Sequence, residues 1–492
     1  MKKIESDLIV IAAGAAGLSA AVAAAQCGLS VIIFEKNAIT GGTANKGMGP
    51  LGIESRHTRA RLLQPTKDEA FRVFMDYTHW RVDAKLVRAF LNKSGDTIHW
   101  LEALGVEFVE PATYFTGSYS TWHLVKPETG PPGPGGAATM MKILTQKAID
   151  LGVVFYLESA VNQIIKENDA VVGVKANDKE GNAIEARANA VIVATGGFGN
   201  SPEMIKEHAG FEVDKDIFPF RIQGITGDGI RMAWEVGAKK TEMSMELVYG
   251  MTDPLNVPPQ LHEACRQPHL FVNYLGERFM NEAIMANVTF TGNALTLQKD
   301  KTGFLIFDEG ILKEMEQDFD TRNRVFPKTN FENSQSIIEV YLKSGRGNFY
   351  VADSLEDLAS QTGIELENLK ETIENYNAYC QNGYDEQFNK ERKYLRPLTG
   401  GKWYAGRHFP SAYGSAGGIK INEKAEVIGQ DWKSIKGFYA AGTDACSIYD
   451  DSYPFIFPGT SMGFAINTGR IAVENIMKFI SEKNKLFYPK HK

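Results

Sequence analysis

Small residues at Ala12, Gly14 and Gly17 stand between two short apolar runs near the start of the chain. Small side chains at this spacing allow a tight turn, a close approach of the backbone to a phosphate and close packing of the following helix. The second apolar run ends at Glu35, where a carboxylate accepts hydrogen bonds from a ribose. This pattern predicts a βαβ unit over residues 7–36 that binds a dinucleotide, with its pyrophosphate at the helix N-terminus.

Ala12 occupies the place where such a turn usually carries its first glycine. An alanine is tolerated there when its φ angle is negative, because a side chain at positive φ is strained. We therefore expect Ala12 to keep a negative φ. The alternative is an ordinary buried βαβ crossover with a small-residue turn, which the acidic residue at the right distance disfavours.

The chain has 492 residues, a composition typical of globular proteins and a net charge of −7. The length predicts two or three domains, and the charge disfavours nucleic acid as a partner. No apolar run is long enough to span a membrane, and the first strand begins too early for a signal peptide, so we expect a cytoplasmic location. The four cysteines form no Cys-x-x-Cys pair, so we expect no metal site.

Other segments have the patterns of elements that would position the turn. Apolar periodicity predicts helices within residues 66–105. Short alternating runs after residue 153 predict strands, with turns at 167–168 and 180–181. Asp228 follows a glycine turn and is expected to cap the next helix.

The composition changes between residues 243 and 401, where the chain is more aromatic, more charged and less regular. We interpret residues 243–401 as an inserted domain. The nucleotide-binding domain is then expected in two parts, over residues 1–242 and 402–492.

Seven segments together resemble a known family. They are the βαβ unit with Glu35, ANAVIVATGGFGNSPEM, TGDGIRMAWEVGA, VNYLGERFMNE, GSAGGIKIN, GFYAAGTDA and PGTSMGFAINTGRIA. In this order the chain resembles, over nearly its whole length, the fumarate reductase/succinate dehydrogenase flavoprotein superfamily, which includes the 3-ketosteroid dehydrogenases. The resemblance implies an α/β fold, with a Rossmann-like FAD-binding domain of the glutathione reductase type and an inserted α+β capping domain.

The resemblance also implies FAD as the cofactor. The helix that follows Pro458 would direct its N-terminus at the flavin's pyrimidine end, where negative charge gathers on reduction. No histidine lies between Lys36 and Arg56, where succinate dehydrogenases attach FAD, so the FAD is expected to be non-covalent. The expected FAD-binding residues are Gly14, Ala15, Ala16, Gly17, Glu35, Lys36, Gly41, Gly42, Thr43, Ala44, Gly47, Ala160, Val161, Ala194, Thr195, Gly196, Asp228, Gly442, Asp444, Gly459, Ser461 and Met462.

The residues with which fumarate reductases bind a dicarboxylate have no counterparts at the matching positions. Ala286 and Asn287 stand where the family carries its proton-donating Arg and the neighbouring Asp. Gly414 and Tyr249 fall at or near the family's two histidines, and Ile456 falls near its last arginine. Without cations, two desolvated carboxylates would stay unpaired. We therefore do not expect fumarate or succinate as the substrate.

Aromatic residues replace these cations. The turns YGSAGG and FPGTSMG resemble those of 3-ketosteroid dehydrogenases, which bind the substrate carbonyl with tyrosine hydroxyls and a glycine N–H. The resemblance implies Tyr249 as proton donor or acceptor, and Tyr413 or Tyr453 with the Gly459 N–H as the oxyanion partner. Phe455 stands where the ketosteroid pattern has a tyrosine, so a strict steroid substrate is not implied. The alternative for each tyrosine is packing, with its hydroxyl on a backbone carbonyl.

Two other polar residues are expected to be structural: His123, although it could reach the flavin region, and Arg278, which lies in a turn motif of the family.

The expected activity is hydride transfer between flavin N5 and the activated C=C of a fairly apolar small molecule of the enone or enoate type. The chain has no haem or iron–sulfur motif, so an external electron donor or acceptor is expected, whether NAD(P)H, a quinone or a redox protein. One alternative is an electron-transfer flavoprotein subunit of a larger redox complex. Another is a flavin monooxygenase or oxidase.

Overall fold

A computed structural model describes residues 2–251, 257–317, 333–345 and 347–487 of the chain. Two compact units are present. Unit 1 comprises Met1–Gly210, Phe220–Glu246 and Gly414–Lys492, and unit 2 comprises Phe211–Pro219 and Leu247–Tyr413. These limits lie further along the chain than the expected domain limits at 242/243 and 401/402, which remain a prediction.

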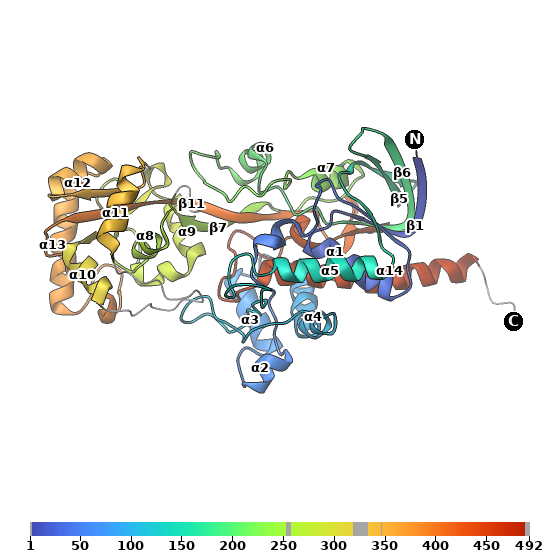
Figure 1. Cartoon of the computed structure of the whole chain (residues 1–492), viewed down its shortest axis with the longest axis horizontal. Coiled ribbons are helices and arrows are strands. Elements are labelled where there is room, and N and C mark those ends of the chain that lie inside the picture. Colours follow the sequence, from blue (N-terminus) through green and yellow to red (C-terminus); the bar gives the residue numbers. More distant parts are fainter. Residues whose placement is uncertain (1, 252–256, 318–332, 346, 488–492) are drawn as a thin grey trace. The chain divides into compact units, whose positions relative to one another are not determined.

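Unit 1 is built around a mostly parallel sheet, drawn in Figure 1 near the N-terminus. Its strands are β1 (Lys2–Ile11), β2 (Val31–Phe34), β3 (Val154–Tyr156), β4 (Ala160–Glu167), β5 (Ala170–Asn177), β6 (Ala183–Val193), β12 (Glu426–Ile428) and β13 (Ser434–Ala440). The strand order is β12-β13-β5-β6-β1-β2-β3, with β4 paired to β5. Because β1 pairs in parallel with β2 and β6, Ile11, Phe34 and Val193 end at one edge. This is the predicted α/β arrangement.

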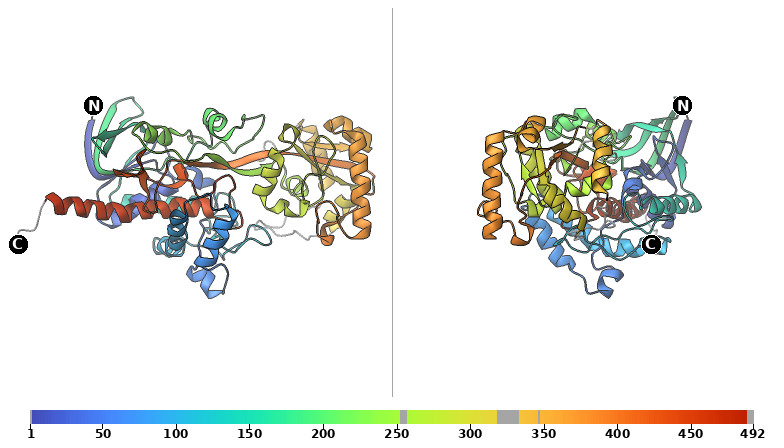
Figure 2. Two further views of the ribbon diagram at one scale, coloured as in Figure 1. Left: turned by 180° about the vertical axis from the view of Figure 1, so that it is seen from behind. Right: turned by 60° about the vertical axis from the view of Figure 1, so that its left-hand side comes forward.

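Helices cover this sheet, and the long final helix lies along it. Figure 2 shows that helix, α14, from behind; it has 28 residues and packs with α5 against α1. The helices of unit 1 are α1 (Ala15–Gln26), α2 (Arg56–Ala60), α3 (Lys67–Tyr77), α4 (Ala84–Ala103), α5 (Ala138–Asp150), α6 (Pro202–Met204), α7 (Asp228–Glu235) and α14 (Thr460–Phe487), with short turns η1 (Gly42–Lys46), η2 (Ile205–Ala209) and η7 (Gly442–Asp444) and the strand β14 (Ala445–Cys446). Helix α7 packs on β4 and β6.

The predicted helical region 66–105 forms the two helices α3 and α4. Thr66 caps α3, and the carboxylate of Asp83 accepts N–H bonds at the start of α4. The predicted turns at 167–168 and 180–181 connect β4 to β5 and β5 to β6. The expectation for Asp228 was wrong: Gly227 is the N-cap of α7 and Asp228 is its first residue.

The expectation of a negative φ at Ala12 was also wrong, because its φ is +84°. The carbonyl of Ala12 faces Gly17, where any Cβ would overlap the carbonyl oxygen. The turn therefore combines a strained alanine with an obligatory glycine, since α1 approaches β1 too closely for a side chain at position 17.

Unit 2 contains an antiparallel sheet in which β9 and β10 flank β11 and β8 pairs with β9. Its elements are α8 (Pro259–Ala264), β8 (Leu270–Val272), η4 (Glu282–Ala286), α9 (Val288–Thr296), η5 (Lys299–Lys301), β9 (Gly303–Asp308), α10 (Glu309–Gln317), α11 (Ser334–Lys343), β10 (Phe349–Ala352), α12 (Leu355–Thr362), α13 (Leu366–Asn382) and η6 (Arg392–Tyr394). The strands β7 (Ser244–Gly250) and β11 (Trp403–Gly418) contain residues of both units.

Arg278 holds unit 2 together from its interior. Its guanidinium donates to the carboxylates of Glu282 and Asp385, and all three side chains are buried. The Lys390 ammonium lies 3.3 Å from Glu282 and donates to the Tyr376 hydroxyl. These contacts support a structural role for Arg278, since removing one member of such a cluster leaves a buried charge unpaired.

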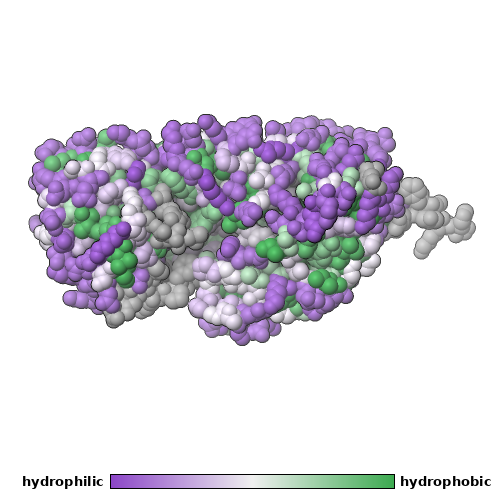
Figure 3. Space-filling model, turned by 45° about the horizontal axis from the view of Figure 1, so that its top comes forward, coloured by the Kyte–Doolittle hydropathy of each residue, from purple (hydrophilic) through white to green (hydrophobic). Residues whose placement is uncertain are grey.

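Hydrophilic side chains dominate the face drawn in Figure 3, with apolar residues in small scattered groups. None of the helices in the described part of the chain is long and apolar enough to cross a membrane.

The strain at Ala12 predicts that Ala12→Gly stabilises the protein. A non-glycine residue at positive φ costs about 1–3 kcal/mol, of which the flexibility of glycine in the unfolded chain returns a part. We expect the thermal unfolding midpoint to rise by about 1–2 °C, because the unfolding entropy of a chain of this length is large. Ala13→Gly is the control at the neighbouring position, because Ala13 is buried and has no positive φ, so its midpoint should not rise. A lower midpoint for Ala12→Gly would contradict the strain.

Candidate functional site

The expected cofactor residues follow four strands of unit 1 at a single edge of the sheet. Gly14 follows β1, Glu35 follows β2, Ala194 follows β6 and Gly442 follows β13. Strands β13 and β6 are parallel, and Ala440 of β13 lies opposite the last residue of β6. Carboxyl ends of parallel strands form the ligand crevice of such sheets, because the connections there leave backbone groups free to face a ligand.

The N-terminus of α1 is open for an anion. Gly14 is its N-cap, and neither a capping side chain nor an acidic residue stands in the first turn. A Cβ on Gly14 would meet no atom within 4 Å. Gly41 donates its N–H to the carbonyl of Ala13 at 2.8 Å, which places the second glycine-rich loop beside this turn. The helix dipole and open N–H groups suit a pyrophosphate.

The loop after Gly41 reaches the start of α14. A Cβ on Gly47 would overlap the side chain of Met462, and Leu51 donates its N–H to the carbonyl of Gly459 at 2.8 Å. Gly442 lies against α1, because a Cβ there would come within 3.0 Å of the Cβ of Ala16. The sequence-predicted residues of α1, the loop, η7 and α14 therefore come together.

Glu35 is buried and holds the first turn in place. Its Oε2 accepts the N–H of Ala13 at 2.9 Å, and its Oε1 accepts the backbone N–H and side-chain amide of Asn37 at 2.8 and 2.9 Å. A carboxylate accepts about four hydrogen bonds, so one acceptor position of Oε2 is left for a ribose hydroxyl. The carbonyl of Glu35 binds the N–H of Ser159, which places Ala160 and Val161 next to it.

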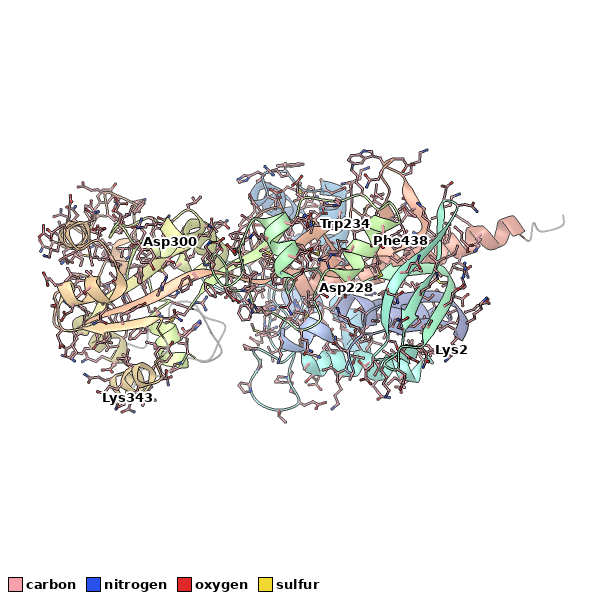
Figure 4. All side chains as sticks on the ribbon, turned by 90° about the horizontal axis from the view of Figure 1, so that it is seen from above. Lys2, Asp228, Trp234, Asp300, Lys343 and Phe438 are labelled. Carbon is pink, nitrogen blue, oxygen red and sulfur yellow. The ribbon has the colours of Figure 1, made fainter. Side chains whose placement is uncertain are left out.

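Lys36 and Asp228 bind each other. The Lys36 ammonium lies 2.5 Å from the Asp228 carboxylate and 2.9 Å from the Thr226 hydroxyl. Figure 4 labels Asp228 and Trp234 at the two ends of α7. Both partners of the ion pair are partly exposed, so the pair is a weak tether between the end of β2 and α7. Their contact with a cofactor stays a prediction.

Asp444 is fully buried and fixes the turn after β6. Its carboxylate accepts the backbone N–H and hydroxyl of Thr195 and, at 2.8 Å, the N–H of Gly197. Burial raises the pKa of this carboxyl, and the donors from residues 195–197 offset part of that rise. The side chain of Asp444 thus positions Thr195 and Gly196 beside the crevice.

These residues fit FAD. They provide an open helix N-terminus for the pyrophosphate, an acidic acceptor for the ribose and a second helix, α14, for the far end of an extended cofactor. Among the residues that the structure describes, no group of three or more His, Cys, Asp or Glu side chains is arranged to hold a metal ion.

Five buried aromatic side chains lie in succession near the start of α14, and we call them the ring cluster: Tyr114, Trp122, Tyr449, Tyr453 and Phe455. The ring centroids are 5.8 Å apart for Trp122 and Tyr114 and 4.8 Å apart for Tyr114 and Phe455. They are 4.7 Å apart for Phe455 and Tyr453 and 4.9 Å apart for Tyr453 and Tyr449. Such rings form an apolar wall that suits an apolar ligand.

Tyr453 offers a hydroxyl beside the helix N-terminus. Its oxygen accepts the N–H of Ser461 at 3.1 Å, which leaves its hydrogen able to donate. Burial raises the pKa of the phenol, and the negative charge of Glu246 raises it further. The group therefore stays protonated and can stabilise an oxyanion. Gly459, with φ of +87°, could not carry a side chain, because a Cβ would overlap Leu51, Pro50 and Trp122.

The sequence reasoning missed Glu246. This glutamate lies in β7, is 5% exposed, and its Oε1 has no hydrogen-bond partner among the described residues. A charged residue inside the apolar run MELVYG was the available signal, because a strand buried on both faces has no water-exposed place for it.

The other predicted catalytic residues belong to unit 2. Tyr249 is buried, with its ring edge-on to His408 at 5.2 Å and below the Arg266 guanidinium at 5.3 Å. Tyr413 is 40% exposed. Their part in the site stays a prediction. In β7, alternation places Tyr249 and Glu246 on opposite faces of the strand.

His123 of unit 1 packs as a structural residue. One ring nitrogen lies 2.8 Å from the Ser55 hydroxyl and the other lies 3.0 Å from the Thr121 carbonyl. Burial lowers the pKa of His123 to about 4, so the imidazole is neutral at pH 7. These contacts leave its ring nitrogens engaged with the protein and support the structural interpretation.

Comparison with known proteins places the chain in a family. A model of the FAD binding domain matches residues 7–455. Vinyl phenol reductase of Lactiplantibacillus plantarum is 31% identical over 477 residues, which cover 94% of each chain. Urocanate reductase of Eggerthella lenta is 28% identical over 452 residues, which cover 89% of this chain and 70% of that protein.

A solved structure has the same fold. The 3-ketosteroid delta1-dehydrogenase from Sterolibacterium denitrificans, in complex with 1,4-androstadiene-3,17-dione, has a TM-score of 0.79 at 20% identity, over 96% of this chain and 99% of that chain. The match of the family model to most of the sequence, together with the open N-terminus of α1 and the acceptor at Glu35, shows that this chain is a flavoprotein of the FAD binding domain family.

Proposed function

We propose that the substrate of this FAD-dependent oxidoreductase of carbon–carbon double bonds is a fairly apolar molecule of the enone or enoate type, and not fumarate or succinate. The single observation that carries the proposal is the ring cluster at the start of α14, which has tyrosine hydroxyls as its polar groups. Burial is the main cause of the raised pKa values of Tyr449, Tyr453 and Glu246, as expected for polar groups in an apolar environment.

A dicarboxylate at this place would be unfavourable. Two carboxylates transferred from water to a buried site need cationic partners. An uncharged ring system needs none, and burying it against the ring cluster releases water from apolar surface on both sides.

The proposed reaction needs a hydride donor or acceptor and hydrogen-bond donors to the oxygen on which charge develops. Bound FAD supplies the hydride donor or acceptor at its N5. The Tyr453 hydroxyl can donate to the oxygen on which charge develops, because its own oxygen is fixed by the Ser461 N–H. The Gly459 N–H is the second proposed donor, and Tyr249 and Tyr413 remain candidates from unit 2.

Two of the relatives support an unsaturated substrate that contains a ring. Their names refer to vinyl phenol and to urocanate. We propose a small-molecule or protein electron donor outside this chain, since no second redox centre is expected from the sequence.

The substrate class is tested by reoxidation of the reduced enzyme without oxygen. After photoreduction, the flavin absorbance is followed as an enone, a 3-ketosteroid, 4-vinylphenol, a cinnamate-type enoate or fumarate is added. We expect the apolar compounds to restore the oxidised spectrum and fumarate to leave it reduced. Reoxidation by fumarate and by none of the other compounds would contradict the proposal. Reoxidation only after addition of a co-purified redox protein would favour an electron-transfer subunit.

Tyr453→Phe should slow reoxidation by about a hundredfold, because it removes one donor from the developing oxyanion. The ring and its packing remain, so FAD binding should not change. Tyr156→Phe is the matched control: Tyr156 lies in β3, where its ring stacks on Phe34, and this variant should reoxidise like the wild type. Equal rates for all three proteins would remove Tyr453 from the mechanism.

Acid precipitation should release the flavin, because no histidine lies between Lys36 and Arg56. We expect a yellow supernatant and a colourless pellet. A pellet that keeps the flavin absorbance after washing would show a covalent bond.

A further inference from the structure

The carboxyl group of Glu246 is buried in unit 1 with little hydrogen bonding from the residues that the structure describes. The residue is 5% exposed, and its Oε1 has no hydrogen-bond partner in the described part of the chain. The nearby Ser461 hydroxyl is the one group that favours the ionised form of the carboxyl. A buried carboxylate with so little support is costly, and proteins retain such groups mainly where they act on a ligand.

Glu246 lies close to the ring cluster. Burial is the main cause of the raised pKa values of the Tyr449 and Tyr453 phenols and of the Cys446 thiol, and the charge of Glu246 adds to each rise, so all three groups lie close to it. Gly414 of β11 faces the carboxylate from the other side, where a Cβ would come within 3.4 Å of Oε2.

A second polar group near Glu246 also lacks a strong partner. The Tyr449 hydroxyl is fully buried, with only the weakly accepting thiol of Cys446 beside it. Two unsatisfied polar atoms in an otherwise apolar region indicate a place where a ligand completes the hydrogen bonding.

We propose that Glu246 is the proton carrier of the reaction, giving its carboxyl proton to the substrate carbon next to the one that exchanges hydride. This inference rests on the proposed function. In the reducing direction the O–H bond of Glu246 breaks as the C–H bond forms from the π electrons of the double bond. Hydride from reduced FAD completes the two-electron reduction, and solvent returns a proton to Glu246. In the dehydrogenating direction the carboxylate accepts the proton.

The neutral acid is present at the pH of the cell. Burial raises the pKa of Glu246 to about 7, and the Ser461 hydroxyl offsets only part of this. The titratable groups that face it, Cys446, Tyr449 and Tyr453, also have raised pKa values, so they stay neutral while Glu246 titrates. A donor near neutrality transfers protons efficiently in either direction.

The competing carrier from the sequence is Tyr249. Its ring packs among His408 and Arg266 of unit 2, and strand alternation turns it away from the face that carries Glu246. His408 cannot act as the acid either, because burial lowers its pKa to about 3 and its Nε2 lies 2.7 Å from the carbonyl of Cys265.

Glu246→Gln tests the proposal, because glutamine keeps the shape of the side chain and removes the proton. The probe is the compound that reoxidises the wild-type flavin fastest. We expect a loss of at least a hundredfold in the reoxidation rate, with substrate affinity changed only a few-fold. The wild-type rate should be constant below pH 7 and fall as pH rises through about 7, and the variant should lack this fall.

Glu102→Gln is the matched control. Glu102 is partly exposed and also has one buried oxygen without a partner among the described residues, but it pairs with Arg56 and His57 on another part of unit 1. This variant should keep the rate and the pH profile of the wild type. Wild-type turnover in Glu246→Gln would overturn the proposal. A hundredfold loss of rate in Tyr249→Phe would also overturn it, if Glu246→Gln kept the fall in rate at alkaline pH.

A measurement that needs no substrate tests this proposal independently of the proposed function. The infrared carbonyl band of a protonated carboxyl should disappear as pH rises through about 7 in the wild type and be absent from Glu246→Gln. Because its pKa is raised in the folded protein, Glu246 favours the folded state at low pH and loses this contribution as pH rises through about 7. At pH 8, the thermal unfolding midpoint of the variant should therefore be higher than that of the wild type. A band lost near pH 4, as in an exposed carboxyl, would contradict the role of Glu246 even if the substrate class is right.

Discussion

The buried carboxylate of Asp444 joins the two strand ends on which the cofactor crevice depends. It follows β13 and accepts hydrogen bonds from the turn that follows β6, so two connections far apart in the sequence have one fixed geometry. These donors are backbone and hydroxyl groups, which replace the water that a carboxylate needs. These contacts fix the turn after β6 to the turn after β13, and the second turn lies against α1, where a Cβ on Gly442 would come within 3.0 Å of the Cβ of Ala16.

Glu246 lies in the opposite environment. Both carboxyls are buried and both have raised pKa values, but Asp444 has donors from three neighbouring residues, whereas Glu246 has only the Ser461 hydroxyl beside it. The same residue chemistry thus serves two purposes. A carboxylate satisfied by the protein fixes a turn, and one that is left unsatisfied is able to exchange a proton with a ligand.

The ring cluster is the reason for proposing a substrate other than that of the fumarate reductases. The aromatic rings near α14 contact one another, and the polar groups among them are tyrosine hydroxyls. An apolar wall with a few hydroxyl donors selects against charge more strongly than it selects one shape. The same FAD-binding sheet can therefore serve several unsaturated substrates when the residues around the flavin end change.

Much of unit 1 was predictable from the sequence, because its signals are local. The apolar runs, the spacing of Gly14 and Gly17 and the acid at Glu35 define a βαβ unit with few alternatives, and the matching family model confirms the FAD-binding fold. The helices within 66–105 and the turns of β4–β6 follow from periodicity in the same way. The sign of φ at Ala12 was not predictable, because it depends on how tightly β1 is followed by α1.

The sequence by itself determined the cofactor class and the parallel sheet. Only the tertiary structure decided which polar groups are satisfied. The sequence shows that Asp444, Arg278 and Glu246 can carry a charge, but it does not show which groups surround them. Their partners come from residues up to 249 positions away. Hydrogen bonding and desolvation are set by those distant partners, so the chemistry of a buried charge becomes visible only once the chain is folded.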